Sequence, residues 1–509
     1  MILNHKDLPF YLIIFFSATC LKIIIELIAY PYPIGYDVVN YYIPMLSNFE
    51  NEWIFILRDY PFYTYVLHIV QNLTGLSAQN TVSVIAALFF GLFAVSIFSL
   101  GKALIRNSNH LPLLISLFVI LQIPVLRTTW DLHRDMFSLS MMFFAISILI
   151  KLRKSYPNRF LDLAFISSLS FTVLSVISDR MVGAWLISVY GICNVLYRER
   201  TVAINFVVAL VLFIAVLAVT GDGYSIINSA IESISDQGLD GQISNEEGQL
   251  SDSYNPNNLF SYFIALNILL VPLGIIGYLR LENQMLKVIL IVAFVCSITW
   301  LVFPRSSELV ADRWTLLFGI SLSVFSGFGF VRIIQIMSER LRNTYLNILI
   351  SAIIFLGCTH LGITYAVLPY EAQLSMIGLF DDNIHKFVPK SMQFNSVKVD
   401  QSPIILDVVH WINENTPAQS KIIGSNDWRG WFILELTNSR SYVGYERLED
   451  LFSNATAGTN PVQGYLIAPK VSDNDPIHHR INSALGGIEA YSNNLFTVYR
   501  IWENTKYAH

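Results

Sequence analysis

The chain of 509 residues is 54% hydrophobic and only 14% charged, with a mean hydropathy of +0.52. Because soluble proteins carry about 25% charged residues, this composition excludes an ordinary soluble protein and predicts a polytopic membrane protein. The net charge of −5 comes with no basic tract, which argues against a nucleic-acid partner.

Eleven apolar segments approach the length of about 20 residues that a helix needs to cross a bilayer. These segments are 9–30, 80–105, 111–127, 136–151, 160–178, 181–197, 203–220, 259–279, 285–303, 314–331 and 345–367. We therefore expect a polytopic all-α bundle of about 11 transmembrane helices.

Lysine and arginine in the short loops indicate the orientation, since they are enriched on the cytoplasmic side. With a cytoplasmic N-terminus, fourteen of these residues lie inside and six outside; the six are Arg58, Arg127, Arg134, Arg180, Arg305 and Arg313. The loop 221–258 has seven acidic residues and neither lysine nor arginine, as expected of a translocated loop. Eleven crossings would place the C-terminus outside. The loop itself is interpreted either as a mobile lid or as a plain disordered segment.

The last 142 residues differ in character from the rest. Apolar runs shorten to strand length in KIIG, RSYVGY, GYLIAP and LFTVYRI, and PIILDVVHWINENTP has the pattern of an amphipathic helix. We expect a membrane domain over residues 1–367, with a first outer loop at 31–79. A small α/β domain over 368–509 should follow on the outer face.

Charged residues occur in every short outer turn of this topology. Asp37 lies in the first outer loop, and RTTWDLHRD, SDR and FPRSSELVADRW are later outer turns. Carboxylates can accept a proton from an acceptor group or hold a divalent metal, and arginines can bind a phosphate with two hydrogen bonds. Charges at this depth therefore suit a substrate that has its phosphate at the membrane surface and its tail in the bilayer.

Simpler roles exist for the same residues. Arginines at helix ends are commonly solvated or snorkelling, and Asp37 stands where an ordinary helix N-cap would. Asp131 and Asp135 could share one helix face, or one of them could cap the fourth helix. Lys22 and Glu26, four residues apart in the first helix, are interpreted as an ion pair facing the bundle, with an ion pathway as the alternative.

Several motifs together resemble one family. PIGYDVVNYYIP followed by RDYPFYTYVLHIVQNLTGLS is similar to the first outer loop of the GT-C membrane glycosyltransferases. DLHRDMFSLSMMF resembles their acidic second site, SDRMVGAWL a polar turn with arginine, and DRWTLLFGISLSVFSGFG an arginine-bearing helix in a later loop. The family includes protein mannosyltransferases and the catalytic subunit of oligosaccharyltransferase.

The resemblance implies roles for particular residues. Catalytic acids would be Asp37, Asp131 and Asp135. Contacts to lipid phosphate would come from Arg313, with Arg305 as the alternative. Further candidates for substrate binding are Arg134, Arg180, Tyr36, Tyr41 and Glu308.

The outer domain contains one more similar stretch. IIGSNDWRGWFILELTNSRSYVGYERLED is laid out like the segment around the WWDYG motif of oligosaccharyltransferases, but the double tryptophan and the tyrosine are absent. Asp427, Trp428 and Arg429 are therefore candidates for the acceptor side. The alternative is that these aromatic residues form the core of the small domain.

The resemblance implies transfer of a sugar from a polyprenyl-phosphate donor to a protein or glycan acceptor, among membrane lipids and with inversion. Asp37 is followed by Val38 and Val39 rather than by a D-x-D motif. No metal ligand is therefore assigned, although Mg²⁺ or Mn²⁺ remains an open cofactor.

Sequons at Asn72 and Asn454 fall on the outer side, and with the resemblance they suit an archaeal membrane. The competing hypotheses are a transporter or flippase for lipid-linked sugars and a non-catalytic membrane assembly protein.

Overall fold

The computed structural model divides the chain into two compact units. One consists of Met1–Pro31 and Phe49–Met392, the other of Tyr32–Asn48 and Gln393–His509. The structure describes residues 7–29, 35, 37–47, 61–105, 108–155, 163–220, 260, 263–264, 266–302, 311–340, 344–367, 402–425, 428–437, 440–445, 464–470, 481 and 487–501. The loop 221–258 and the sequon at Asn454 lie outside these ranges.

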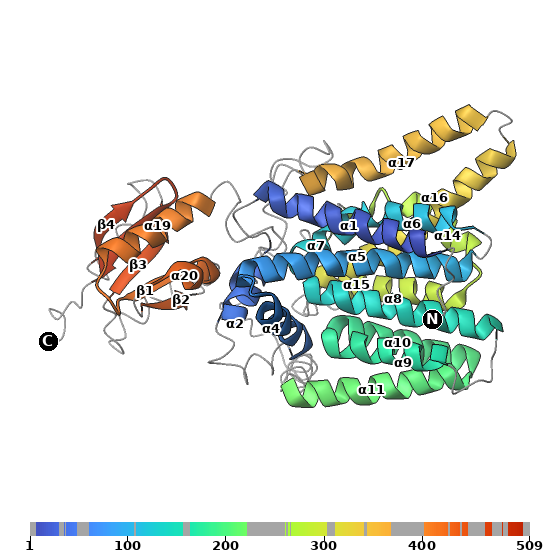
Figure 1. The fold of residues 1–509 in the computed structure, drawn as a ribbon, viewed down its shortest axis with the longest axis horizontal. Helices are drawn as coiled ribbons and strands as arrows, with labels where there is room; N and C mark the ends of the chain where they lie inside the picture. Colours follow the sequence, from blue (N-terminus) through green and yellow to red (C-terminus); the bar gives the residue numbers. More distant parts are fainter. Residues whose placement is uncertain are drawn as a thin grey trace, which may run out of the picture. The chain divides into compact units, whose positions relative to one another are not determined.

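The first unit is a bundle of helices, shown in Figure 1. Its helices are α1 (Leu8–Ala29), α4 (Pro61–Thr74), α5 (Ala78–Leu104), α6 (His110–Ile120), α7 (Ile123–Asp131), α8 (His133–Ser155), α9 (Leu163–Ser178), α10 (Arg180–Tyr197), α11 (Arg200–Thr220), α14 (Val271–Arg280), α15 (Gln284–Val302), α16 (Ala311–Arg340) and α17 (Thr344–Val367). Each of the eleven predicted apolar segments overlaps a helix of this set, although the helix α14 in the segment 259–279 begins only at Val271.

Within the described residues, seven helices are long and apolar enough to cross a membrane, or eight if the bent pair α6 and α7 counts as one span. Shorter apolar helices cover Leu163–Ser178, Val271–Arg280 and Tyr345–His360. Helix α11 buries few of its strongly apolar side chains, and Val211 and Ile214 among them are exposed. Lipid can cover such a surface without cost whereas water cannot. The chain is therefore a multi-pass membrane protein.

The segment predicted as one helix at 111–127 is instead two helices. α6 and α7 meet at an angle of 62°. Pro124, in the first turn of α7, has no backbone N–H to continue the hydrogen-bond ladder of α6. The break allows α7 to end at Asp131, just before α8 begins at His133. Asp131 and Asp135 consequently do not share one helix.

Glycines bring α14 and α16 into backbone contact. A Cβ on Gly277 would lie 2.0 Å from the Phe325 carbonyl oxygen, and one on Gly329 would lie 2.0 Å from that of Leu273. The Ser326 hydroxyl adds a hydrogen bond of 2.8 Å to the Leu270 carbonyl oxygen. Small residues of this kind let membrane helices approach closely, so that dispersion contacts hold them together.

The second unit contains a five-stranded sheet with the strand order β2-β1-β3-β5-β4. The strands are β1 (Lys421–Ser425), β2 (Ser441–Tyr445), β3 (Gly464–Pro469), β4 (Ile488–Ser492) and β5 (Phe496–Ile501). β1 pairs in parallel with β2 and β3, whereas β5 is antiparallel to β3 and β4. With α19 (Ser402–Asn415) and α20 (Arg429–Glu435), this confirms the predicted small α/β domain.

The segment around Asp37 belongs to this second unit, although we expected it in an outer loop of the membrane domain. It forms a π-helix, η1 (Val38–Tyr42), and a short α2 (Ile43–Ser47). Val39 is fully buried in one core cluster with Ile405, Val409 and Trp431. Asn40 Oδ1 accepts a hydrogen bond of 3.0 Å from the Gly430 backbone N–H. Apolar burial and this bond attach the segment to the sheet domain.

We expect Gly277→Ala to lower the thermal unfolding midpoint of the purified protein in detergent, because the new methyl group would meet the backbone of α16. Overpacking of this kind costs about 1–3 kcal/mol. The control is Gly357→Ala in α17, where a Cβ meets nothing within 4 Å. Equal midpoints for the two variants would contradict the backbone contact.

A second prediction concerns the attachment of the Asp37 segment. Asn40→Ala removes the acceptor of the Gly430 N–H, and an unsatisfied buried donor costs about 1–3 kcal/mol. Gly430→Ala should be worse, since its Cβ would lie 2.1 Å from the Val39 carbonyl oxygen. Limited proteolysis of the full chain should release the sheet domain faster in both variants. Asn415→Ala, which loses only a local bond to the Trp411 carbonyl oxygen, should behave as wild type.

Candidate functional site

Charged side chains from three separate turns meet at one end of the helical unit. Arg134 and Asp135 lie in the first turn of α8, Asp179 precedes α10, and Arg313 lies near the start of α16. Asp135 and Asp179 are only 2% and 5% exposed. Each comes from a helix end that the sequence assigned to the outer boundary. We call these four residues the arginine–carboxylate cluster.

Arg134 and Asp179 form the central ion pair, with 3.3 Å between Arg134 Nε and Asp179 Oδ2. The other oxygen of Asp179 accepts a hydrogen bond of 2.9 Å from the Val182 backbone N–H and so caps α10. Burial by itself would raise the pKa of Asp179. The Arg134 guanidinium, the bond from Asp135 and the Val182 N–H outweigh that effect and hold the pKa below its ordinary value.

Asp135 is hydrogen-bonded to Asp179 and lies within the electrostatic reach of Arg313 and Arg134. Asp179 thus has the ion pair with Arg134 and the N–H donor of Val182, whereas Asp135 contacts Asp179 and lies near both arginines. Among the described residues, the buried Asp135 Oδ1 has no hydrogen-bond partner.

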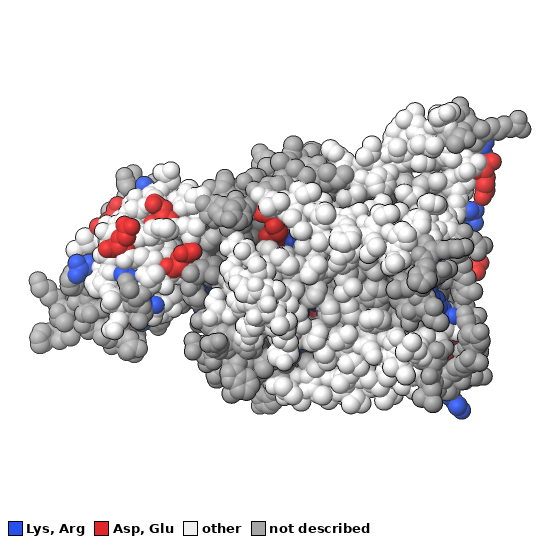
Figure 2. Space-filling model, viewed as in Figure 1, with Lys and Arg blue, Asp and Glu red and all other residues white. Residues whose placement is uncertain are grey.

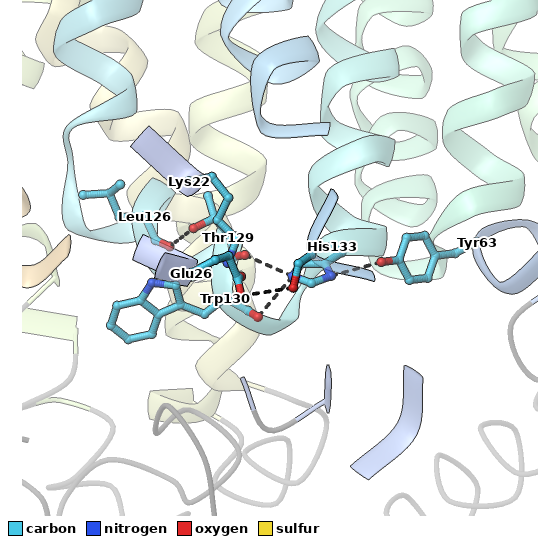
Figure 3. A network of polar contacts seen from close by, with 8 residues as sticks. Lys22, Glu26, Tyr63, Leu126, Thr129, Trp130 and His133 are labelled. Carbon is cyan, nitrogen blue, oxygen red and sulfur yellow. Dashed lines mark hydrogen bonds and ion pairs between the residues drawn. The ribbon is translucent and has the colours of Figure 1, made fainter. Parts of the chain in front are cut away.

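A hydrogen-bonded histidine, directly before Arg134 in the chain, joins α7 to α8, and Figure 3 shows its contacts. His133 Nε2 lies 3.1 Å from the carbonyl oxygens of both Thr129 and Trp130, so it carries the proton that it donates to them. The Tyr63 hydroxyl, 3.0 Å away, then donates to Nδ1. Three elements thereby hold the backbone next to Arg134 in one position.

The predicted pair of Lys22 and Glu26 is confirmed. Lys22 is fully buried, and its Nζ lies 2.5 Å from Glu26 Oε1. Ser83 on α5 donates a hydrogen bond of 3.1 Å to the other Glu26 oxygen. Figure 3 places the pair beside Thr129 and Trp130. The same end of the bundle thus contains a second charged pair, in which Lys22 is buried and Glu26 is half-buried.

Two further predicted arginines lie at this end of the bundle. Arg127 on α7 is only 1% exposed, and its guanidinium lies 5.6 Å from the centre of the Trp130 ring. Arg180 is half-buried at the start of α10. Arg127 is therefore packed inside the bundle and is not a snorkelling residue on a free surface.

Asp37 lies in the second unit and is 8% exposed. It precedes the π-helix η1, but its side chain makes no capping hydrogen bond there. Asp37 thus occupies the N-cap position that the sequence suggested, without the side-chain bond of a cap. π-helical turns are rare and often occur at functional positions. Tyr41, on the same helix, is 39% exposed.

The aromatic residues proposed for the acceptor side belong to the core of the sheet domain. Trp431 is 1% exposed, and Trp428 packs edge-on against Phe496 with ring centres 4.9 Å apart. Arg429 is exposed at the start of α20. Arg440 bonds the carbonyl oxygens of Asn413 and Thr416 and so joins the end of α19 to β2. The structure thus gives Trp428 and Trp431 a packing role, whereas Arg429 is open to a partner.

Other predicted site residues lie outside the described part of the chain. They are Tyr36, Arg305, Glu308, Asp427 and the side chain of Asp131. Within the described residues, no three histidine, cysteine or carboxylate side chains form a group that could hold a metal ion.

The sequence did not single out three residues of this region. Asp179 was noted in its turn but given no role, and Tyr63 and His133 were given none. The signal for Asp179 was present, since it directly precedes Arg180 in an outer turn. Tyr63 gave no such signal, because only folding brings α4 next to α8.

We expect Arg134→Gln to destabilise the protein by about 3–5 kcal/mol, because it leaves the buried Asp179 without its partner. Arg134→Gln combined with Asp179→Asn should recover part of this loss, since no uncompensated charge then remains. Thermal unfolding of the two single variants and the double variant measures the coupling. If the double variant lost as much stability as the two single variants together, the result would contradict the ion pair.

The same pair predicts a pH dependence. The folded-state pKa of Asp179 is below its ordinary value of 3.8, so its contribution to stability is complete above about pH 4 to 5. That contribution is lost as the pH falls through the lower folded-state value. Asp179→Asn should flatten this acid limb in unfolding curves measured between pH 7 and pH 3. An acid limb that is the same in wild type and in Asp179→Asn would contradict the lowered pKa of Asp179.

Comparison with known proteins gave matches only among solved structures: no protein-family model and no curated protein matches the chain. The crystal structure of an Archaeoglobus fulgidus oligosaccharyltransferase with a tethered acceptor peptide covers 90% of this chain and 69% of its own, with 11% identity and a TM-score of 0.49. Cryo-EM structures of the mycobacterial arabinofuranosyltransferase AftD cover 96% of this chain.

For AftD the identity is 13% and the TM-score 0.49, and for a mutant form they are 14% and 0.50. This chain spans only 40% to 41% of the AftD chain. At these identities the likeness concerns the fold alone. Together with the helical bundle and the small sheet domain, it shows that the chain has a GT-C-like fold.

Proposed function

We propose that the chain is a GT-C-type membrane glycosyltransferase that transfers a sugar from a polyprenyl-phosphate donor to an acceptor on the outer face of the membrane. The observation that carries the proposal is the buried arginine–carboxylate cluster at one end of a GT-C-like bundle. The matched structures support it in kind, since both are named as glycosyltransferases.

The arginines would stabilise the leaving phosphate. Arg134 is held by Asp179, so it supplies positive charge without moving freely. Arg313 is half-buried beside the two carboxyl groups and is our first candidate for binding the phosphate, with Arg305 and Arg180 after it. A departing phosphate gains negative charge in the transition state, and fixed guanidinium groups stabilise that charge.

A carboxylate would accept the proton of the acceptor. In the proposed reaction the acceptor oxygen bonds to the anomeric carbon while its proton passes to the carboxylate of Asp37. The bond from the anomeric carbon to the phosphate oxygen breaks, and its electrons leave with the polyprenyl phosphate. The sugar is thereby inverted. Asp37 is buried and is not used as a helix cap, which suits a base protected from bulk water.

We propose that the reaction does not depend on a divalent metal ion. Asp179 is occupied by Arg134 and the Val182 N–H, and Asp135 is bonded to Asp179. Hard cations need several free oxygen ligands, and this pair of carboxyl groups supplies few.

A protein or a glycan is the proposed acceptor.

The test is transfer of radiolabelled sugar from a polyprenyl-phosphate donor by the purified protein in lipid, with and without chelator. We expect Asp37→Asn to lose at least about a hundredfold in rate, as removal of a general base does. Arg313→Gln should mainly lower kcat, because the charge it stabilises develops in the transition state. Chelator should have no effect.

The matched control is Arg332→Gln, at the opposite end of the same helix α16. It removes the same charge, and its ion pair with Glu339 is long, at 3.9 Å. Full transfer by Asp37→Asn would refute the assigned base. Equal losses in Arg313→Gln and Arg332→Gln would refute a specific phosphate contact. A folded wild type that transfers from no lipid-phosphate donor would refute the function.

A further inference from the structure

A polar cavity of about 530 Å³ lies at the opposite end of the helical unit from the arginine–carboxylate cluster. α8 and α10 begin at the cluster, and their last residues, together with those of α5 and α14 and the start of α15, line the cavity. Its lining includes Arg153, Tyr197, Arg280 and Asn283 beside the apolar Ile105 and Ile150. The proposed transfer reaction makes no use of it.

The depth of the cavity coincides with the ends of the membrane spans. Four apolar spans end or begin at residues that line it, namely Leu104, Arg153, Tyr197 and Gln284. A bilayer places its lipid headgroups at the ends of such spans. The cavity is therefore at headgroup level, and its walls are partly polar and partly apolar, as a headgroup with its glycerol requires.

Arg153 lines the cavity, and its neighbours hold its guanidinium in one orientation. Its Nε donates to both carboxylate oxygens of Glu199, at 2.9 Å each, and its guanidinium stacks 3.6 Å from the centre of the Tyr197 ring. These contacts fix the plane of the group. The guanidinium also lies within hydrogen-bonding reach of the Tyr197 hydroxyl, and a fixed fork of donors is the group that binds phosphate best.

Two further groups in the lining can bind an anion. The buried Tyr197 hydroxyl has no well-aligned hydrogen-bond partner among the described residues. Arg280 is exposed at the end of α14 and has no acceptor or ion-pair partner within them. Glu282 also lines the cavity, so the site contains both positive and negative side chains. Binding of an anion there would depend on the placed donors and not only on net charge.

The surroundings favour an anion over a cation. Among the described residues, the helix ends on this side of the bundle contain more basic than acidic side chains. The basic ones are Lys102, Lys151, Arg153, Arg198, Arg200, Arg280, Lys287, Arg332 and Arg340, and the acidic ones are Asp7, Glu199, Glu282 and Glu339. Figure 2 shows charge at this rim and almost none along the flank of the bundle. A basic rim of this kind attracts anionic lipids.

We propose that this cavity binds the phosphate headgroup of an anionic phospholipid in the leaflet opposite the arginine–carboxylate cluster. Arg153 and Arg280 bind the phosphate oxygens, and the Tyr197 hydroxyl donates a further hydrogen bond. Ile105, Ile150 and Leu281 contact the glycerol and the first acyl carbons. The phosphate chemistry could also suit a soluble phosphate compound. The position at the ends of four spans favours the lipid.

The test is native mass spectrometry of the full chain in detergent, titrated with phosphatidylglycerol or with phosphatidylcholine. We expect wild type to retain phosphatidylglycerol and not phosphatidylcholine. Arg280→Gln and Arg153→Gln should each weaken retention about five- to tenfold, which corresponds to the loss of a charged hydrogen bond. Arg280 is exposed and has no partner among the residues that the structure describes, so we expect its variant to fold.

The control is Arg340→Gln, which removes one exposed positive charge at the same rim outside the cavity. It should leave retention unchanged. Equal weakening by Arg340→Gln and Arg280→Gln would reduce the effect to general surface charge and overturn the site. Equal retention of phosphatidylglycerol and phosphatidylcholine would also overturn the site. Displacement of the lipid by millimolar inorganic phosphate would overturn the lipid assignment in favour of a soluble phosphate ligand.

Discussion

The buried ion pair of Arg134 and Asp179 is the interaction on which the candidate site depends. It connects the start of α8 to the start of α10, and Asp179 at the same time caps α10. An unpaired charge at this depth would be strongly destabilising. The pair therefore exists only in a fold that brings these helix ends together, and it places Asp135 and Arg313 beside it. The charge that we propose for the chemistry is in this way also needed for packing.

The two ends of the bundle handle charge differently. At the cluster end, arginines and carboxylates are buried and bonded to each other. Their charges therefore stay compensated while a substrate enters and leaves. At the opposite end, basic side chains are more exposed, and Arg153 is only partly neutralised by Glu199. Surface pairs of this second kind contribute little to stability. They remain available for the headgroups of the surrounding bilayer.

The sheet domain is not a simple C-terminal appendage. Residues from the first loop complete its core through Val39 and bond its α20 through Asn40. The carboxylate of Asp37 therefore depends on residues some 390 positions later in the chain. Such a long-range contact gives the domain a direct influence on the residue that we propose as the base.

The sequence by itself determined the membrane class, the positions of the apolar helices, the α/β domain and the placement of charge at helix ends. Hydrophobic periodicity and composition carry that information locally. Only the tertiary structure decided the break at Pro124, the joining of Asp179 with Arg134 and Asp135, and the attachment of the Asp37 segment to α20. Each of these depends on which surfaces meet, and burial between distant segments leaves no periodic signal in the chain. The close approach of Gly430 to Val39 is one such contact. The sequence does not distinguish a glycine in a turn from a glycine in a packed interface.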